Sequence, residues 1–192
     1  MEIFIKNWTE WLMVLVCLVG LAYTAFVIKN EKKSYQDSAQ SFNFLHFLLP
    51  LPSWWAIKEK KEDLIRFYRA DTRYEWEALF QWVPSKISNP EELIEKRISF
   101  KEIKIDKLTM EFQTKETLKL SKNLQQDKNI DIARVEGTAS TSEFERIYYD
   151  CFIICDPKRQ GYLLCESISS VLNGLVEGPY FEQVIEGLTL ND

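Results

Sequence analysis

Residues 147–155 read IYYDCFIIC, a stretch that is apolar on both faces of an extended chain except at Asp150. A short run of this kind is typical of a strand in the middle of a sheet that is covered on both sides. Residues 156–161, DPKRQG, have the composition of a turn, and residues 161–169, GYLLCESIS, return as a second strand. The sequence therefore predicts a hairpin at the centre of a sheet.

A second hairpin is predicted at residues 63–82. Residues 64–71, LIRFYRAD, are strand-like up to a polar turn, and an alternating pattern follows over residues 73–82. One face of this second strand carries mainly large aromatic side chains, namely Tyr74, Trp76, Ala78, Phe80 and Trp82. The Val-Pro pair at 83–84 ends the pattern, because proline cannot donate to a sheet ladder.

Two helices are predicted from the residues at their ends. Residues 90–97 follow a capping residue, Ser88 or Asn89, and have proline at the first helical position. The final helix is expected over residues 178–186, where a Gly-Pro pair opens it and Gly187 caps its carboxyl end.

The remaining patterns are weaker. Short apolar groups suggest further strands at residues 98–100, 103–105, 108–112 and 118–120. A polar loop is expected at residues 121–129. Residues 136–145, EGTASTSEFE, and 169–174, SSVLNG, are interpreted as connections, although their small polar side chains would also suit a binding loop.

Consecutive strands with one short helix between them and one at the end favour an antiparallel α+β domain over an alternating parallel one. A chain of 192 residues has room for one such domain besides an anchor. We therefore predict an α+β protein with one N-terminal transmembrane helix, followed by a small domain with a mainly antiparallel, curved β-sheet and a C-terminal helix.

The anchor is predicted at residues 11–28, which read WLMVLVCLVGLAYTAFVI and carry no charge. At 1.5 Å per residue this helix covers about 27 Å, close to the thickness of a hydrocarbon core. A cleaved signal peptide is the alternative, but residues 22–25, AYTA, make a poor cleavage site, and Glu2 and Glu10 offset Lys6. The interpretation is an uncleaved signal-anchor that contacts the lipid bilayer through residues 11–28.

The anchor divides the chain. Residues 1–10 form an N-terminal flank, residues 29–41 a polar tether or a helical extension of the anchor, and residues 58–192 the α+β soluble domain. Three lysines in residues 29–33 against one in the flank predict that the domain lies in the cytoplasm, at the cell (inner) membrane. The opposite orientation, with the domain outside, remains open.

Residues 42–57, FNFLHFLLPLPSWWAI, are apolar and aromatic but too short, and too broken by Pro50 and Pro52, for a second span. They would suit a segment lying at the headgroup level of the membrane, with Trp54 and Trp55 followed by lysines. Packing into the core of the domain is the second interpretation and is the favoured one.

The composition and motifs of the sequence argue against several classes of function. A net charge of −5 argues against nucleic-acid binding. His46 is the sole histidine, and no phosphate-binding loop, zinc-protease motif or nucleophile-elbow motif occurs. We predict no catalytic, cofactor-binding or metal-binding residue, and no enzymatic activity.

The cysteines do not form a metal signature. Cys151 and Cys155 would lie roughly 13 Å apart on a regular strand, too far to share one zinc ion. Cys165 could reach a cysteine of the opposite strand in a disulfide, depending on the register of the hairpin. Reduced, buried thiols are the favoured interpretation for a cytoplasmic domain.

Two kinds of candidate site follow. Asp150 is a candidate buried titratable group, which we expect to pair with Arg146 or Arg159. The aromatic surplus suggests a surface for a partner or a ligand, made of Phe44, Phe47, Trp54, Trp55, Tyr74, Trp76, Phe80 and Trp82. The leading hypothesis is a noncatalytic, membrane-anchored accessory or assembly protein that binds another protein. The alternative is a membrane-tethered domain that binds an apolar ligand or lipid in a sheet-lined cavity.

Overall fold

The computed structural model describes residues 8–69, 75–86, 89–143 and 145–191. Two compact units make up the chain, residues 1–39 and residues 40–192. The turn predicted after residue 69, Tyr74 and Ser88 lie outside the described residues.

The first unit is built around one helix, α2, which spans Trp8–Ser38. Its apolar window, Glu10–Val27, has a mean hydropathy of 2.0, and none of it is buried within the protein. A core helix of a soluble protein would be largely buried, whereas α2 is long and apolar enough to cross a bilayer, a property that signal sequences share. Of the two interpretations of residues 29–41, the structure shows the helical extension, which reaches Ser38.

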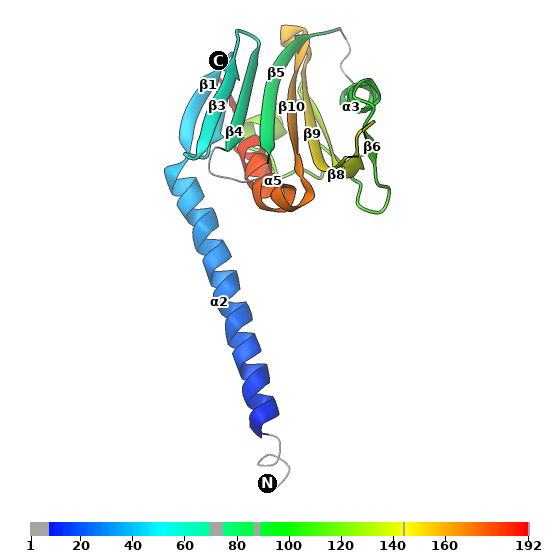
Figure 1. Ribbon diagram of the computed structural model, residues 1–192. Coiled ribbons are helices and arrows are strands. Elements are labelled where there is room, and N and C mark those ends of the chain that lie inside the picture. Colours follow the sequence, from blue (N-terminus) through cyan, green and yellow to red (C-terminus); the bar gives the residue numbers. More distant parts are fainter. Residues whose placement is uncertain (1–7, 70–74, 87–88, 144, 192) are drawn as a thin grey trace. The chain divides into compact units, whose positions relative to one another are not determined.

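The second unit contains an eight-stranded antiparallel sheet with the order β3-β4-β5-β10-β9-β8-β6, in which β7 also pairs with β8 (Figure 1). Its strands are β3 (Trp55–Lys60), β4 (Leu64–Arg69), β5 (Trp76–Pro84), β6 (Lys104–Ile105), β7 (Glu111–Thr114), β8 (Asp131–Ser140), β9 (Arg146–Asp156) and β10 (Gly161–Ser170). A smaller sheet has the order β1-β2-β11, with β1 at Gln40–Phe44, β2 at Phe47–Leu51 and β11 at Thr189–Leu190. The helices of this unit are α3 (Pro90–Phe100), α4 (Lys122–Gln126) and α5 (Val171–Glu186), with a 3-10 turn at Pro157–Arg159.

The predicted α+β fold is confirmed, and so are both hairpins. β9 and β10 pair at the centre of the sheet, with Cys165 opposite Phe152 and Glu166 opposite Cys151. β4 and β5 form the second hairpin, in which Phe67 lies opposite Ala78. The run at residues 147–155 is apolar on both faces, and both faces are covered in the structure. This pattern is why the sequence alone could place the strand at the centre of the sheet.

One face of the large sheet packs against α5 and the small sheet. Phe181 of α5 contacts the rings of Phe80 and Phe152, with centroid separations of 5.9 and 5.8 Å. Residues 42–57 supply β1, β2 and the start of β3, and Phe47 and Trp55 are buried in the same cluster. The core-packing interpretation of this segment is therefore the one that the structure shows.

α3 covers only part of the other face. It packs on β8 and β9, where Leu93 and Ile94 are buried against a second apolar cluster. Asn89 caps this helix by accepting hydrogen bonds from the backbone of Glu91 and Glu92. The area over β4, β5 and β10 lies beyond the helix, and the candidate site is found there.

The start predicted for the final helix is wrong. α5 begins at Val171, so residues 169–174 are the end of β10, the helix cap Ser170 and the first turn of α5 rather than a turn between strands, and Pro179 lies inside the helix. Ser170 starts it by accepting a hydrogen bond from the backbone N–H of Asn173. Gly187 ends the helix as predicted.

The middle of the chain also differs from the prediction. Residues 98–100 end α3, residues 118–120 form no strand, and the loop predicted at 121–129 contains α4, whose Leu124 is buried. Residues 136–140 belong to β8, a long inner strand. Its second half contains glycine, threonine and serine and therefore does not look like a strand in the sequence. The sequence pattern did not predict this strand, because β8 is stabilised by pairing with β7 and β9 and its side chains show little strand preference.

Candidate functional site

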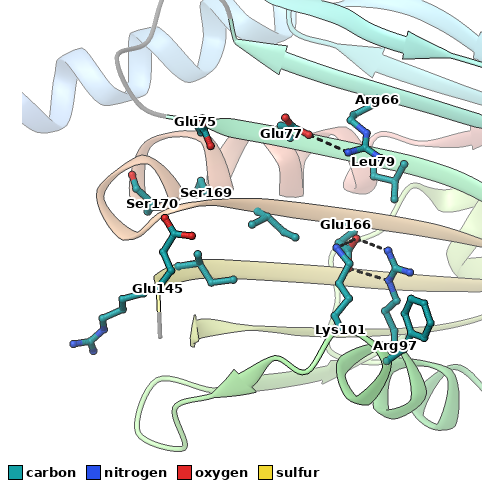
Figure 2. A pocket seen from close by; sticks show the side chains of 14 residues that line it. Arg66, Glu75, Glu77, Leu79, Arg97, Lys101, Glu145, Glu166, Ser169 and Ser170 are labelled. Atoms are coloured by element: carbon teal, nitrogen blue, oxygen red, sulfur yellow. Dashed lines mark hydrogen bonds and ion pairs between the residues drawn. The ribbon is translucent and has the colours of Figure 1, made fainter. Parts of the chain in front are cut away.

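A groove of about 560 Å³ crosses the part of the sheet that α3 leaves open (Figure 2). β5, β9 and β10 form its floor, Arg66 of β4 lies on one side, and the carboxyl end of α3 forms the opposite wall. Four basic and four acidic side chains line it, namely Arg66, Arg97, Lys101, Arg146, Glu75, Glu77, Glu145 and Glu166.

Glu166 is the buried centre of the groove. Arg97 donates two hydrogen bonds to its carboxylate, of 3.1 Å from Nε and 2.7 Å from Nη2, and the ammonium of Lys101 lies 2.7 Å from Oε2. Tyr149 donates a further hydrogen bond of 2.8 Å from the sheet. Burial by itself would raise the pKa of Glu166, but the two cations outweigh this effect and hold the pKa below its usual range.

This network fixes the wall of the groove to its floor. Glu166 lies on β10, whereas Arg97 and Lys101 lie at the end of α3, as Figure 2 shows. Two cations on one buried carboxylate leave a positive excess at this wall. The carboxyl end of α3 is therefore held in place by charge as well as by apolar packing.

The opposite wall carries equal numbers of basic and acidic groups. Glu77 of β5 accepts hydrogen bonds from Lys58 and from Arg66, the latter over 3.2 Å. Glu75, which precedes β5, adds a second exposed carboxylate at this wall. Fixed charges therefore border the groove on both sides, with a positive excess only at the α3 wall.

Between the charged walls the groove is apolar. Leu79, Ile147 and Ile168 lie on its floor, and Phe100 stands at its rim with 79% of its surface exposed. An apolar strip bordered by fixed charges of both signs suits an amphipathic polypeptide segment, whose side chains can fill the strip while its polar groups meet the rim.

The aromatic surface predicted from the sequence is not a surface. Most of its residues are buried in the main core, namely Phe44, Phe47, Trp55, Trp76 and Phe80, while Trp54 and Trp82 are partly buried against it. Tyr74 lies outside the described residues. The prediction misjudged these side chains because alternation identifies a buried face of a strand without showing what covers it.

These rings also fill the space that an apolar ligand would need. Trp55 packs against Trp76 with ring centroids 4.6 Å apart, and Phe67 packs against Phe80 at 5.8 Å. Phe181 of α5 closes the cluster from the other side. The described aromatic face is a packed core in this structure, which argues against the apolar-ligand alternative.

Asp150 is fully buried, and its partner is Arg134 rather than Arg146 or Arg159. Arg134 donates hydrogen bonds of 3.0 Å and 2.9 Å to the two carboxylate oxygens. Arg159 instead pairs with Asp156, and Arg146 lies 3.9 Å from Asp106. The sequence could not identify Arg134 because it lies on β8, the strand that the pattern missed.

The other reactive side chains have structural roles. His46 lies in the β1–β2 turn, with its Nε2 atom 3.8 Å from Asp156, and burial together with Arg159 lowers its pKa. All four cysteines are unpaired. Cys165 belongs to one core cluster, and Cys151 and Cys155 belong to the other, on the opposite face of the sheet. A disulfide from Cys165 is thereby excluded in this fold.

The groove residues Glu166, Arg97 and Phe100 were not identified from the sequence. Glu166 carries the same signal as Asp150, since it is a carboxylate within an otherwise buried strand. Arg97 and Phe100 carry none, because a charged and an aromatic residue near the end of an exposed helix are ordinary. Among the described residues, no group of three or more histidine, cysteine or acidic side chains could hold a metal ion.

Comparisons with known proteins identify a solved structure with the same fold. No protein-family model and no curated protein matches the sequence. The solution structure of cyanobacterial PsbP (CyanoP) from Synechocystis sp. PCC 6803 matches with a TM-score of 0.54 over 80% of this chain and 92% of that one, at 9% identity. The two domains share a fold. At this identity the likeness extends no further.

Two other solved structures match less closely. The Ran-binding protein Mog1p of Saccharomyces cerevisiae gives a TM-score of 0.49 at 6% identity, covering 80% of this chain and 96% of that one. A protein of Bacteroides thetaiotaomicron gives 0.48 at 14% identity, covering 81% of this chain. The chain spans only about half of the Bacteroides protein, 49% of its length.

Proposed function

We propose that this chain is a noncatalytic, single-pass membrane-anchored accessory or assembly protein whose domain binds a segment of another protein in the groove. The observation that carries this proposal is the combination of an apolar floor, an exposed Phe100 and walls that carry fixed charges of both signs. Protein interfaces have this organisation, an apolar centre with aromatic anchors surrounded by a polar rim.

The chemistry of the groove favours binding over catalysis. Its central carboxylate is engaged by Arg97, Lys101 and Tyr149, so the groups most able to move a proton hold one another in place. Among the lining residues that the structure describes there is no histidine or cysteine, and the Ser169 hydroxyl donates to the backbone carbonyl of Ser170 rather than to a base. A rigid, charged and partly apolar groove is what a docking site requires.

The role of α2 in this proposal is to fix location. An apolar helix without buried surface would hold the domain at the inner membrane, and the lysines that follow its apolar window favour a cytoplasmic domain. Binding at a membrane surface raises the effective concentration of the domain toward other membrane proteins.

Site-specific photocrosslinking in native membranes tests the proposal. A benzophenone amino acid is placed at Phe100 and, separately, at Glu75, which lie on opposite sides of the groove. Leu108 is the matched control, because it is apolar and 94% exposed but does not line the groove. The proposal predicts one discrete adduct from both groove positions and none from the control.

Two outcomes contradict it. If neither groove position gives an adduct, the groove is empty in the membrane. If Leu108 gives the same adduct as Phe100, the partner does not recognise the groove.

A further inference from the structure

The outer face of the first half of α5 is entirely apolar. Leu172, Leu175 and Val176 are 65%, 67% and 54% exposed, and Pro179 is exposed on the same side one turn later. Their spacing of three, four and seven residues places them in one stripe along the helix. We call these four residues the α5 stripe.

No charge interrupts the α5 stripe. Glu177 is the single charged residue from Val171 to Phe181, and it is buried, where it accepts hydrogen bonds from Arg69 and from the indole of Trp55. The exposed face of α3 in the same domain carries Glu91, Glu92, Glu95 and Lys96, as solvated helices do. The α5 stripe therefore differs from an ordinary solvated face.

The α5 stripe lies at the end of the domain where the chain arrives from α2. Gln40, the first residue of the domain, pairs with Leu51 at the end of β2. A few residues later Trp55 begins β3, and its indole contacts Glu177 beneath the stripe. Within the domain, Figure 1 shows the start of β1 and the start of α5 at the same end.

The chain between the apolar window and the domain is short. The window ends at Val27 and the domain starts at Gln40, so twelve residues separate them, nearly all of them helical. A helix of that length rises about 18 Å, which sets how far the first residue of the domain lies from the end of the apolar window. This short connection tethers the start of β1, and the α5 stripe lies at the same end of the domain.

We infer that the α5 stripe is a second membrane contact, which rests at the boundary between the headgroups and the acyl chains of the bilayer. Apolar side chains without charges suit this boundary, and confinement by the anchor removes most of the entropic cost of reaching it. The inference rests on the membrane anchoring in the proposed function. Two contacts at one end of the domain fix its orientation, so that the groove is presented at a constant angle to membrane proteins.

Fluorescence of the full-length protein in vesicles of phosphatidylcholine and phosphatidylglycerol tests this. The environment-sensitive dye NBD is attached to a cysteine introduced at Leu175, at Glu95 on the charged face of α3, or at Val16 in the apolar window, with Cys17→Ser in each case. Quenchers carried by the lipid acyl chains then report contact with the bilayer. We expect quenching at position 175 to exceed that at position 95 at least about twofold, with a blue-shifted emission.

The outcomes separate the inference from the anchoring. If position 16 is quenched but position 175 behaves like position 95, the anchor holds and the α5 stripe does not touch lipid. If position 16 is not quenched either, the anchoring itself fails. Crosslinking between two chains through position 175, without lipid quenching, would assign the stripe to a second copy and overturn the inference.

A variant gives the reverse test. With the dye at position 172, Leu175→Glu should reduce quenching to the level seen at position 95, because a carboxylate is costly at the acyl boundary. Leu108→Glu is the control, since Leu108 is more exposed than Leu175 but lies outside the α5 stripe. Unchanged quenching in Leu175→Glu would contradict the inference.

Discussion

Arg134 of β8 holds the carboxylate of Asp150 on the neighbouring strand β9 through two hydrogen bonds, 3.0 Å from Nε and 2.9 Å from Nη2. The same guanidinium lies 2.9 Å from Glu136 and 3.2 Å from Glu182 of α5. Its carbon stands over the ring of Phe152, 4.8 Å from the centroid. One buried cation therefore joins two strands and a helix, and three carboxylates depend on it.

Arg134→Ala should lower the free energy of unfolding by about 3–5 kcal/mol, because it leaves a buried carboxylate without its counter-charge. Urea denaturation of the purified protein measures the change. Arg146→Ala is the matched control, since its side chain is 68% exposed and its carboxylate contact is 3.9 Å long, so its effect should stay within about 0.5 kcal/mol. Equal effects of the two variants would show that Arg134 is not a central support.

Asp150 predicts an unusual dependence of stability on pH. Burial raises the pKa of this carboxyl group to about 7 in the folded protein, despite Arg134, whereas the unfolded chain has the ordinary low value. The folded state then binds more protons than the unfolded state between about pH 4 and pH 7, so this group's stabilising contribution falls as pH rises through that window.

The measurement compares wild type with Asp150→Asn by denaturation across the pH range. The difference between the two should change by up to ~1.4 kcal/mol per pH unit within the window, to the disadvantage of wild type at higher pH. Parallel profiles for the two proteins would mean that Asp150 titrates alike in the folded and unfolded states.

The centre of this fold can be read from the sequence, and its periphery cannot. Apolar runs such as residues 147–155 specify burial by themselves, which is why the central hairpin was predicted with its turn. β8 could not be identified, because Gly137, Thr138 and Ser140 carry no strand signal and the strand exists through pairing with β9. Missing β8 also meant missing Arg134.

The site was hidden for a related reason. Aromatic alternation at residues 76–82 predicted a functional face, but that face is filled by α5, which sequence pattern could not place. The groove lies on the other face, where Glu77 looks like an ordinary surface charge and the signal of Glu166, a carboxylate in a buried strand, was overlooked. Whether a sheet face is covered depends on where a distant helix packs, and that is a tertiary property.

Two glycines of α5 provide a test of helix packing. An added Cβ at Gly174 would lie 2.3 Å from the Cβ and Cγ atoms of Tyr148, whereas one at Gly178 would lie 3.5 Å from the nearest ring atom. Gly174→Ala should therefore push α5 off β9 and cost about 1–3 kcal/mol in the free energy of unfolding.

Gly178→Ala is the control at an ordinary contact distance in the same helix. It should be neutral or stabilise the protein by up to about 1 kcal/mol, since alanine favours a helix more than glycine does. Thermal unfolding of both variants gives the comparison. If Gly174→Ala is as stable as Gly178→Ala, the approach of α5 to Tyr148 is looser than the structure shows.

Glu166 offers the opposite pH dependence to Asp150. Because Arg97 and Lys101 hold its pKa below the usual range, its charged form stabilises the fold above the unfolded pKa, and that contribution is lost as pH falls through the folded pKa. Glu166→Gln should cost about 1–3 kcal/mol near neutral pH, since it leaves two cations at the end of α3 without their carboxylate. Wild type and variant should converge in acid.

Denaturation at several pH values checks this, with the exposed groove residue Glu145→Gln as the control. A penalty for Glu166→Gln that persists unchanged in acid would indicate lost packing rather than lost charge, and the wall of the groove would then not depend on the ion pairs.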